Sequence, residues 1–227
     1  MKADVVNQFG NLAINILISI LAWRHYRRRT FPLAARYSTF APRFWSGSVD
    51  ACILWPIGFI TFTLFSLGIP RSLAAVLVIV ENLAWLIYTV VMHGRYGQTI
   101  GKIVTKVRVV DFRTEGKISF RQAWLREGIP VILSLGMVGY EVYAILTWSA
   151  SPVAIDNDDG LAAGKSFWLL SSIPGLWFLA EVLTMLTNDK RRALHDFIAG
   201  TVVIRTNAAE ETAQLGTAPD NIIQQPI

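Results

Sequence analysis

Residues 43–67, RFWSGSVDACILWPIGFITFTLFSL, decide how this chain folds. The segment is apolar and long enough to cross a bilayer as a helix, which needs about 20 residues. Its first residue is Arg43, and Asp50 follows seven residues later. Seven residues are about two helical turns, so both side chains share one face, with Asp50 about 10 Å deeper. A charge at that depth costs about 2.5 to 3.5 kcal/mol, which indicates either a functional site or a hydrogen-bonded carboxyl that fastens helices.

The composition of the whole chain is typical of a membrane protein. Of its 227 residues, 53% are hydrophobic and 16% are charged, whereas soluble proteins average about 25% charged residues. The formal net charge is +5, but the basic residues lie in blocks beside apolar segments, which indicates membrane topology and not nucleic-acid binding. The single cysteine, Cys52, excludes an intrachain disulfide and a CxxC metal motif.

Four apolar segments are predicted to form core transmembrane helices, namely residues 44–67, 72–92, 129–149 and 167–187. A further apolar run, residues 9–23, precedes the basic sequence RHYRRR. A secretory signal peptide carries its basic cluster before the apolar run, so this segment is not expected to be one. We expect it to pack on the bundle as a short N-terminal span, with an interfacial helix as the alternative.

The basic residues predict the orientation in the membrane. Eighteen of the 21 lysines and arginines lie within residues 24–43, 95–126 and 190–205. The positive-inside rule places these three regions in the cytoplasm. The chain is therefore predicted to be a multi-pass protein of the cell inner membrane with a cytoplasmic C-terminus. Its predicted domains are an N-terminal helix with a basic segment (1–36), a transmembrane domain (37–205) and a disordered cytoplasmic tail (206–227).

The long cytoplasmic loop is expected to carry β-structure. Residues 104–111 alternate between apolar and basic side chains and lead through the turn-like RTEGK to residues 117–119, a pattern typical of a β-hairpin. Residues 201–205 are a third β-rich run. Ser119 with Gln122 forms a capping-box signature for the helix that follows. The predicted fold is an all-α integral membrane protein: four core helices, an N-terminal apolar helix and a small cytoplasmic β-hairpin or sheet.

Each predicted core span contains one acidic residue and no basic residue in its interior. Counted from the cytoplasmic ends, Asp50 and Glu181 lie about 9 Å deep, and Glu81 and Glu141 about 18 Å deep. Intramembrane acids without basic partners are stable when protonated or when bound to a cation. The two layers therefore suit a proton-coupled cation path. The alternative is four neutral carboxyls that hydrogen-bond between helices.

Three local patterns resemble those of the RDD family of bacterial membrane proteins. They are Arg43 with Asp50, then GQTIGK (97–102) leading into VRVVD (107–111), and finally LHDFIAGT (194–201). The family is named for one arginine and two aspartates. The positions that match its motifs are Arg43, Asp50, Gly101, Lys102, Arg126, His195 and Asp196. The resemblance implies a membrane protein for which transport is suggested, with cation/proton antiport proposed for some members.

The second and third patterns lie where the chain enters or leaves the membrane. Lys102 and His195 can reach phosphate head groups or a carboxylate from there. The alternative, which we favour, is a structural collar that positions the helix ends. The spacing of GQTIGK is not that of a P-loop, so nucleotide binding is not expected.

We expect the protein to transport a small ion by cation/proton exchange, with Asp50, Glu181, Glu81 and Glu141 as the candidate ion or proton site. In this hypothesis Asp50 binds and releases the ion, and Arg43 offers it a competing partner. The alternative is a non-transporting scaffold or accessory protein that binds a partner through its basic cytoplasmic face. No nucleophile-and-base pattern or HExxH spacing occurs, so no enzymatic activity, cofactor or metal site is expected. The expected partners are the bilayer, anionic lipids at the cytoplasmic face, monovalent cations, protons and further copies of the chain, without nucleic acid.

Overall fold

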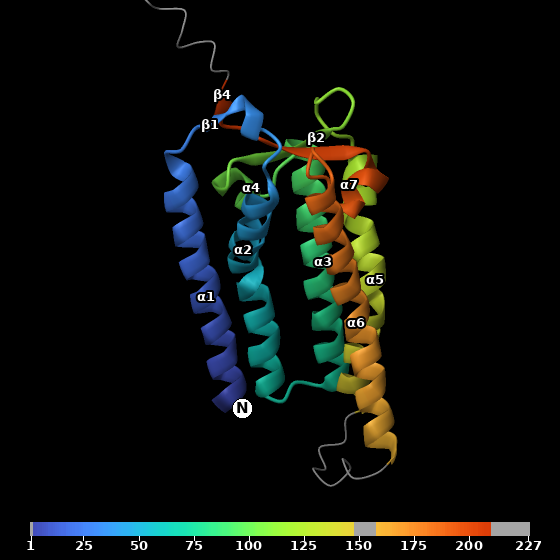
Figure 1. Cartoon of the computed structure of the whole chain (residues 1–227). Helices are drawn as coiled ribbons and strands as arrows, with labels where there is room; N and C mark the ends of the chain where they lie inside the picture. Colours follow the sequence, from blue (N-terminus) through green and yellow to red (C-terminus); the bar gives the residue numbers. More distant parts are fainter. Residues whose placement is uncertain (1, 148–157, 210–227) are drawn as a thin grey trace, which may run out of the picture.

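The computed structural model of the chain describes residues 2–147 and 158–209. These residues form a bundle of long helices that run between two opposite ends of the molecule (Figure 1). The long helices are α1 (Lys2–Arg27), α2 (Phe40–Ser66), α3 (Arg71–Tyr96), α5 (Phe120–Thr147) and α6 (Asp158–Thr187). The short ones are η1 (Leu33–Ala35), α4 (Ile100–Val104) and α7 (Leu194–Ala199). The prediction of a mostly helical protein is confirmed.

Three helices of the described part, α2, α3 and α5, are long and apolar enough to cross a membrane. In α6 the apolar stretch is shorter and covers Ser172–Thr187. Large apolar side chains point outward from the spans; Ile132 and Leu135 of α5, for example, are 65% and 57% exposed. Such a surface suits contact with lipid, so the prediction of several membrane-spanning helices is confirmed. The predicted end of the third span, residues 148 and 149, lies outside the described residues.

The β-structure differs from the predicted hairpin. Strand β2 (Val107–Asp111) pairs antiparallel with β3 (Thr201–Arg205), with Val109 opposite Val203. The third strand predicted at residues 117–119 is wrong. The predicted capping box explains why residues 117–119 form no strand, because a helix begins directly after Ser119. The backbone N–H of Gln122 donates to Ser119 Oγ at 3.2 Å, and the N–H of Ser119 donates to Gln122 Oε1 at 2.9 Å.

A second, unpredicted pair of short strands joins the segment that follows α1 to the C-terminal end of the described chain. Strand β1 (Phe31–Pro32) runs parallel to β4 (Ala208–Ala209). Strand β4 lies within the predicted disordered tail, residues 206–227. The rest of that tail, from residue 210 on, lies outside the described residues.

The β2–β3 sheet caps one end of the bundle, which we call the sheet end. A buried apolar cluster joins the sheet to α3 and α5; its members are Leu86, Val90, Val107, Val109, Ile118, Ala123 and Val203. Strands, α4 and α7 all lie at this end, whereas the α2–α3 turn lies at the opposite end, the far end (Figure 1). The three basic regions of the sequence thus lie at the sheet end.

The close approach of α4 to α2 requires glycine at position 101. A Cβ on Gly101 would lie 2.1 Å from the carbonyl oxygen of Ser46 and 2.9 Å from the carboxyl group of Asp50. We expect Gly101→Ala to lower the free energy of unfolding by about 1 to 3 kcal/mol, the usual cost of overpacking. Thermal unfolding of the purified protein in detergent measures this change.

The matched control is Gly139→Ala in α5, where a Cβ would meet no atom within 4 Å. Alanine is the better helix former by about 1 kcal/mol, so this variant should melt at or above the wild-type temperature. Equal melting temperatures for Gly101→Ala and Gly139→Ala would contradict the close contact between α4 and α2.

Candidate functional site

Asp50 is buried in α2 and accepts hydrogen bonds from two other elements. Its carboxylate accepts from the hydroxyl groups of Tyr88 in α3 and Thr99, each at 2.7 Å, and from the backbone N–H of Gly101 at 2.8 Å. All three donors are neutral. The Tyr88 hydroxyl also accepts the N–H of Ile100 at 3.0 Å, so α4 is tied twice to the bundle. The geometry is that of a carboxyl that fastens the TIGK segment to α2 and α3.

Arg43 has a different partner from the predicted one. Its Nη1 donates to Asp196 Oδ2 of α7 at 2.5 Å, although the sequence predicts Asp50 as the neighbouring charge. Positions along one helix do not reveal a partner on another element, so this ion pair was not predicted. The long guanidinium group reaches sideways to α7, while Asp50 lies two turns deeper and is occupied by neutral donors.

Asp196 is the centre of a buried ion cluster at the sheet end. It is fully buried and also accepts from Arg126 Nη1 of α5, from the Thr201 hydroxyl at 2.8 Å and from the Ala193 N–H at 3.0 Å. Burial by itself would raise the pKa of Asp196, but Arg126 and Arg43 hold it well below its usual value. Asp196 is therefore ionised and is the counter-charge that two arginines share.

Two histidine–glutamate pairs flank this cluster, and the sequence predicted neither. His195 Nδ1 contacts Glu181 Oε1 of α6, and His93 Nδ1 of α3 lies 3.0 Å from Glu127 Oε1 of α5. Each pair joins two different elements, so no spacing along the sequence reveals it. Glu127 was missed for a further reason, since it directly follows Arg126 in a strongly basic region.

Several of these groups line a cavity of about 550 Å³ at the sheet end. Its charged and titratable lining residues are Arg43, Lys102, Arg126, Glu127, Glu181 and His195. Burial and the nearby Arg126 lower the pKa of Lys102 to about 8. Most of the residues that match the family's motifs thus lie around one cavity, with Asp50 and Gly101 in the adjoining α2–α4 contact.

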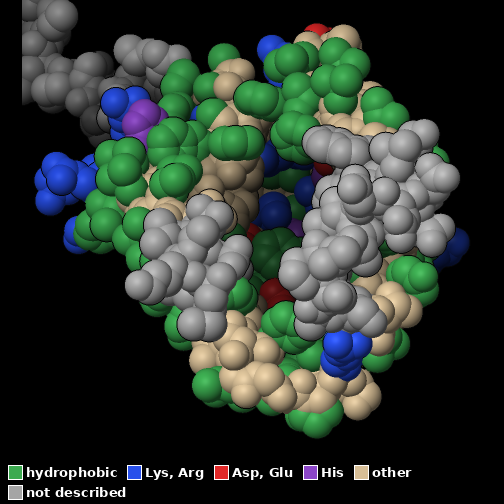
Figure 2. Space-filling model, turned by 90° about the horizontal axis from the view of Figure 1, so that it is seen from below, with side chains coloured by type: hydrophobic (Ala, Val, Ile, Leu, Met, Phe, Trp, Pro, Cys, Tyr) green, Lys and Arg blue, Asp and Glu red, His purple; other side chains and the backbone are tan. Residues whose placement is uncertain are grey.

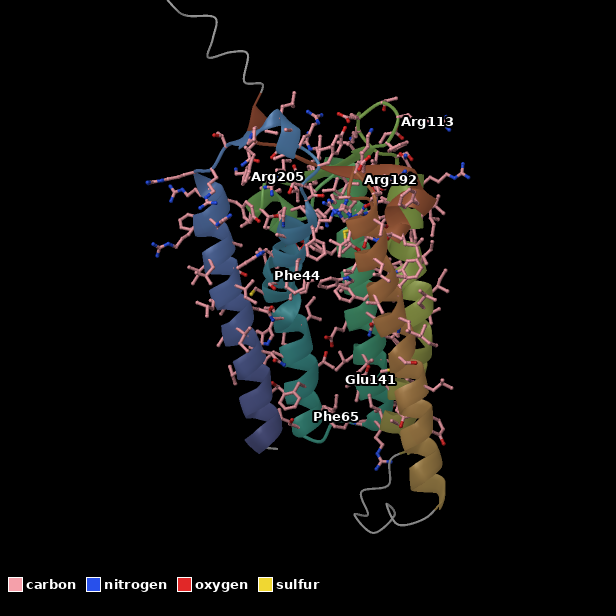
Figure 3. The ribbon with its side chains drawn as sticks, viewed as in Figure 1. Phe44, Phe65, Arg113, Glu141, Arg192 and Arg205 are labelled. Atoms are coloured by element: carbon pink, nitrogen blue, oxygen red, sulfur yellow. The ribbon has the colours of Figure 1, made fainter. Side chains whose placement is uncertain are left out.

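A second cavity, of about 720 Å³, lies in the far half of the bundle between α2, α3 and α5. Both Glu81 and Glu141 line it, and Arg71 lines it at the far end. A Cβ on Gly58 would lie 2.7 Å from Glu81 Oε1, so the glycine leaves room for the carboxylate. Figure 2, which looks in from the far end, shows a central hollow with charged side chains inside, and Figure 3 shows Glu141 in this half.

The four predicted acids are therefore distributed over three environments. Glu81 and Glu141 share the far cavity, Glu181 lines the sheet-end cavity, and Asp50 lies in the α2–α4 contact. A smaller cavity of about 280 Å³ extends from Glu81 to Ala51, the neighbour of Asp50 in the chain. No group of three or more metal-ligating side chains occurs among residues 2–147 and 158–209.

Comparison with known proteins identifies one relationship. The model of the RDD family matches residues 37–200. No curated protein and no solved structure matches the chain. The matched range includes Arg43, Asp50 and Asp196.

Asp196→Asn removes the charge that Arg43 and Arg126 share. We expect a loss of about 3 to 5 kcal/mol in the free energy of unfolding, the usual effect of breaking a buried ion pair from one side. Since the pKa of Asp196 is depressed in the folded protein, its contribution is present at neutral pH and is lost as the pH falls below about 4. The difference in stability between the wild type and the variant, measured by thermal unfolding, should therefore become smaller at acidic pH. Asp189→Asn, an exposed acid nearby, is the control and should change stability by less than about 0.5 kcal/mol.

The lowered pKa of Lys102 predicts a separate pH signature. Between pH 8 and 10.5 the folded protein has lost this proton while the unfolded chain keeps it. The stability of the wild type should therefore rise with pH relative to that of Lys102→Met across this interval. Melting temperatures measured from pH 7 to 10.5 check this expectation. The exposed Lys117 supplies the control variant, Lys117→Met, and parallel curves for wild type and Lys102→Met would show that the pKa of Lys102 is not lowered in the folded protein.

Proposed function

The chain belongs to the RDD family of bacterial membrane proteins, and we propose that it exchanges a monovalent cation for protons across the membrane. One observation carries the proposal: Glu81 of α3 and Glu141 of α5 line the same cavity within the apolar part of the bundle. Among the described residues, Arg71 at the far end is the only basic residue that lines that cavity. Two carboxylates in such a place are stable when they hold protons or a cation, and exchange between these states is the elementary step of antiport.

The sheet-end cavity contains the second proposed site for protons. Imidazole and carboxylate groups that contact one another can hold or pass a proton, and His195 with Glu181 forms such a pair. We place Asp50 between the two cavities, because the small cavity beside Glu81 reaches Ala51, the neighbour of Asp50 in the chain. In this proposal Asp50 takes up the ion when it exchanges its hydrogen bonds with Thr99 and Gly101 for contacts with the ion.

The proposal includes a topology. We propose that α1 and α6 also span the membrane, which gives four core spans and an N-terminal helix, and that the sheet end and the C-terminus lie in the cytoplasm at the inner membrane. The gathering of the three basic regions at the sheet end supports this orientation (Figure 1). Enzymatic activity, a resident cofactor and a nucleic-acid partner form no part of the proposal.

Cation-induced proton flux in proteoliposomes tests the proposed exchange. We expect sodium, potassium or lithium to drive proton movement with the wild type. Glu81→Gln and Glu141→Gln should reduce the flux to that of empty vesicles, because neither amide can bind and release a proton. Asp50→Asn should do the same while the protein stays folded.

Asp189→Asn is the matched control, since it removes an exposed acid and should keep the wild-type flux. Flux that survives both glutamine substitutions would reject the role of the far cavity. A wild type that moves none of the three cations would reject transport and favour a scaffold that binds a partner through its basic face.

A further inference from the structure

The sheet-end cavity lies between two helices that belong to different parts of the bundle. Helix α2 packs on α1, α3 and α4, whereas α6 packs on α5 and α7. Phe40 and Phe44 of α2 line the cavity from one side, and Phe178 of α6 lines it from the other. Phe44 is 62% exposed and Phe178 is 55% exposed. Phe44 lies in the half of α2 nearer the sheet (Figure 3). The two side chains thus frame a lateral window toward the surface that faces lipid.

Behind this window lie buried side-chain nitrogen atoms that have no hydrogen-bond partner among the described residues. Arg43 Nη2 and His195 Nε2 are buried and have no hydrogen-bond partner among the described residues. The Arg43 side chain is only 9% exposed. His195 Nε2 lies 3.8 Å from Asp196 Oδ1, too far for a hydrogen bond. Lys102 lines the same cavity and makes no ion pair within 4 Å in the described part of the chain.

The carboxylates of the cavity are, by contrast, already engaged. Asp196 is bound by two arginines, Glu181 contacts His195 Nδ1, and Glu127 lies between His93 and Arg126. A buried donor without a partner costs about 1 to 3 kcal/mol. The unpaired groups of the cavity therefore need a hydrogen-bond acceptor, and the strongest acceptors are anionic oxygens.

We propose that the window admits the head group of one anionic phospholipid from the leaflet at the sheet end. Phosphate oxygens accept from Arg43 Nη2, Lys102 and His195 Nε2, and the acyl chains leave the cavity over Phe44 and Phe178. The lateral opening and the apolar wall favour a lipid over inorganic phosphate, which has nothing to place against Phe40, Pro130 or Val182.

The charge of the cavity is consistent with this ligand. The three cations Arg43, Lys102 and Arg126 are balanced by Asp196, Glu127 and Glu181. An added phosphate monoanion is matched when His195 takes up a proton, because the imidazolium donates from Nδ1 to Glu181 and from Nε2 to the phosphate. His93 is held by Glu127 on the α3 side and stays outside this exchange.

Native mass spectrometry and thermal unfolding of the delipidated full-length protein in detergent test the site. We expect phosphatidylglycerol to bind one molecule per chain and to raise the melting temperature, and phosphatidylcholine and inorganic phosphate to do neither. Lys102→Met should weaken phosphatidylglycerol binding about tenfold or more, as loss of one charge-assisted contact predicts. This variant keeps the Asp196 cluster, so it should fold, and the readout does not depend on ion flux.

The control is Arg95→Gln, which removes an exposed basic residue at the sheet end outside the window and should keep wild-type binding. Equal weakening by both substitutions would show general surface attraction and overturn the site. Stabilisation by inorganic phosphate that depends on Lys102 would replace the lipid by a soluble anion. Equal binding of phosphatidylcholine, or a dimer that excludes lipid from the window, would also overturn the proposal.

Discussion

The shared carboxylate of Asp196 is the interaction on which the sheet end depends. Two arginines from different helices, Arg43 of α2 and Arg126 of α5, cannot remain buried together without a common counter-charge. Asp196 supplies it from α7, which follows the last long helix of the described chain. The ion cluster therefore pins the C-terminal segment across the ends of two helices. Strand β3 begins two residues after α7, so its pairing with β2 follows from this placement, and the Thr201 hydroxyl that starts β3 joins the same carboxylate.

The acids of the bundle differ in the partners that bind them. Asp196 has two cations and Asp50 has three neutral donors, so each fixes a short helix against the long ones. The Asp50 contact has a further consequence, because it fixes α4 and so brings Lys102 to the sheet-end cavity. In the described part of the chain, Glu81 and Glu141 form no ion pair with a basic residue, and this difference in partners directs the proposed transport step to the far cavity.

Local patterns in the sequence predicted local structure well. Hydropathy located the three confirmed spans, and the Ser119–Gln122 capping box predicted how α5 begins. Contacts between elements were not predictable in the same way. The partner of Arg43 is 153 positions away in the chain, and His93 meets Glu127 only because α3 packs along α5. The resemblance to the family supplied part of what spacing could not, since it selected Arg43, Arg126 and Asp196 as one set without indicating that they touch.

The proposed proton exchange and the proposed lipid binding both use the imidazole of His195. His195 contacts the proposed proton carrier Glu181 through Nδ1, and its Nε2 is the donor offered to the lipid phosphate. Because both contacts involve the same ring, lipid binding and the His195–Glu181 contact cannot be independent. Linkage between two sites is reciprocal, so the free energy that the bound lipid adds to this contact is the free energy that the contact adds to lipid binding. Proton exchange at the sheet end would then depend on the content of anionic lipid in that leaflet.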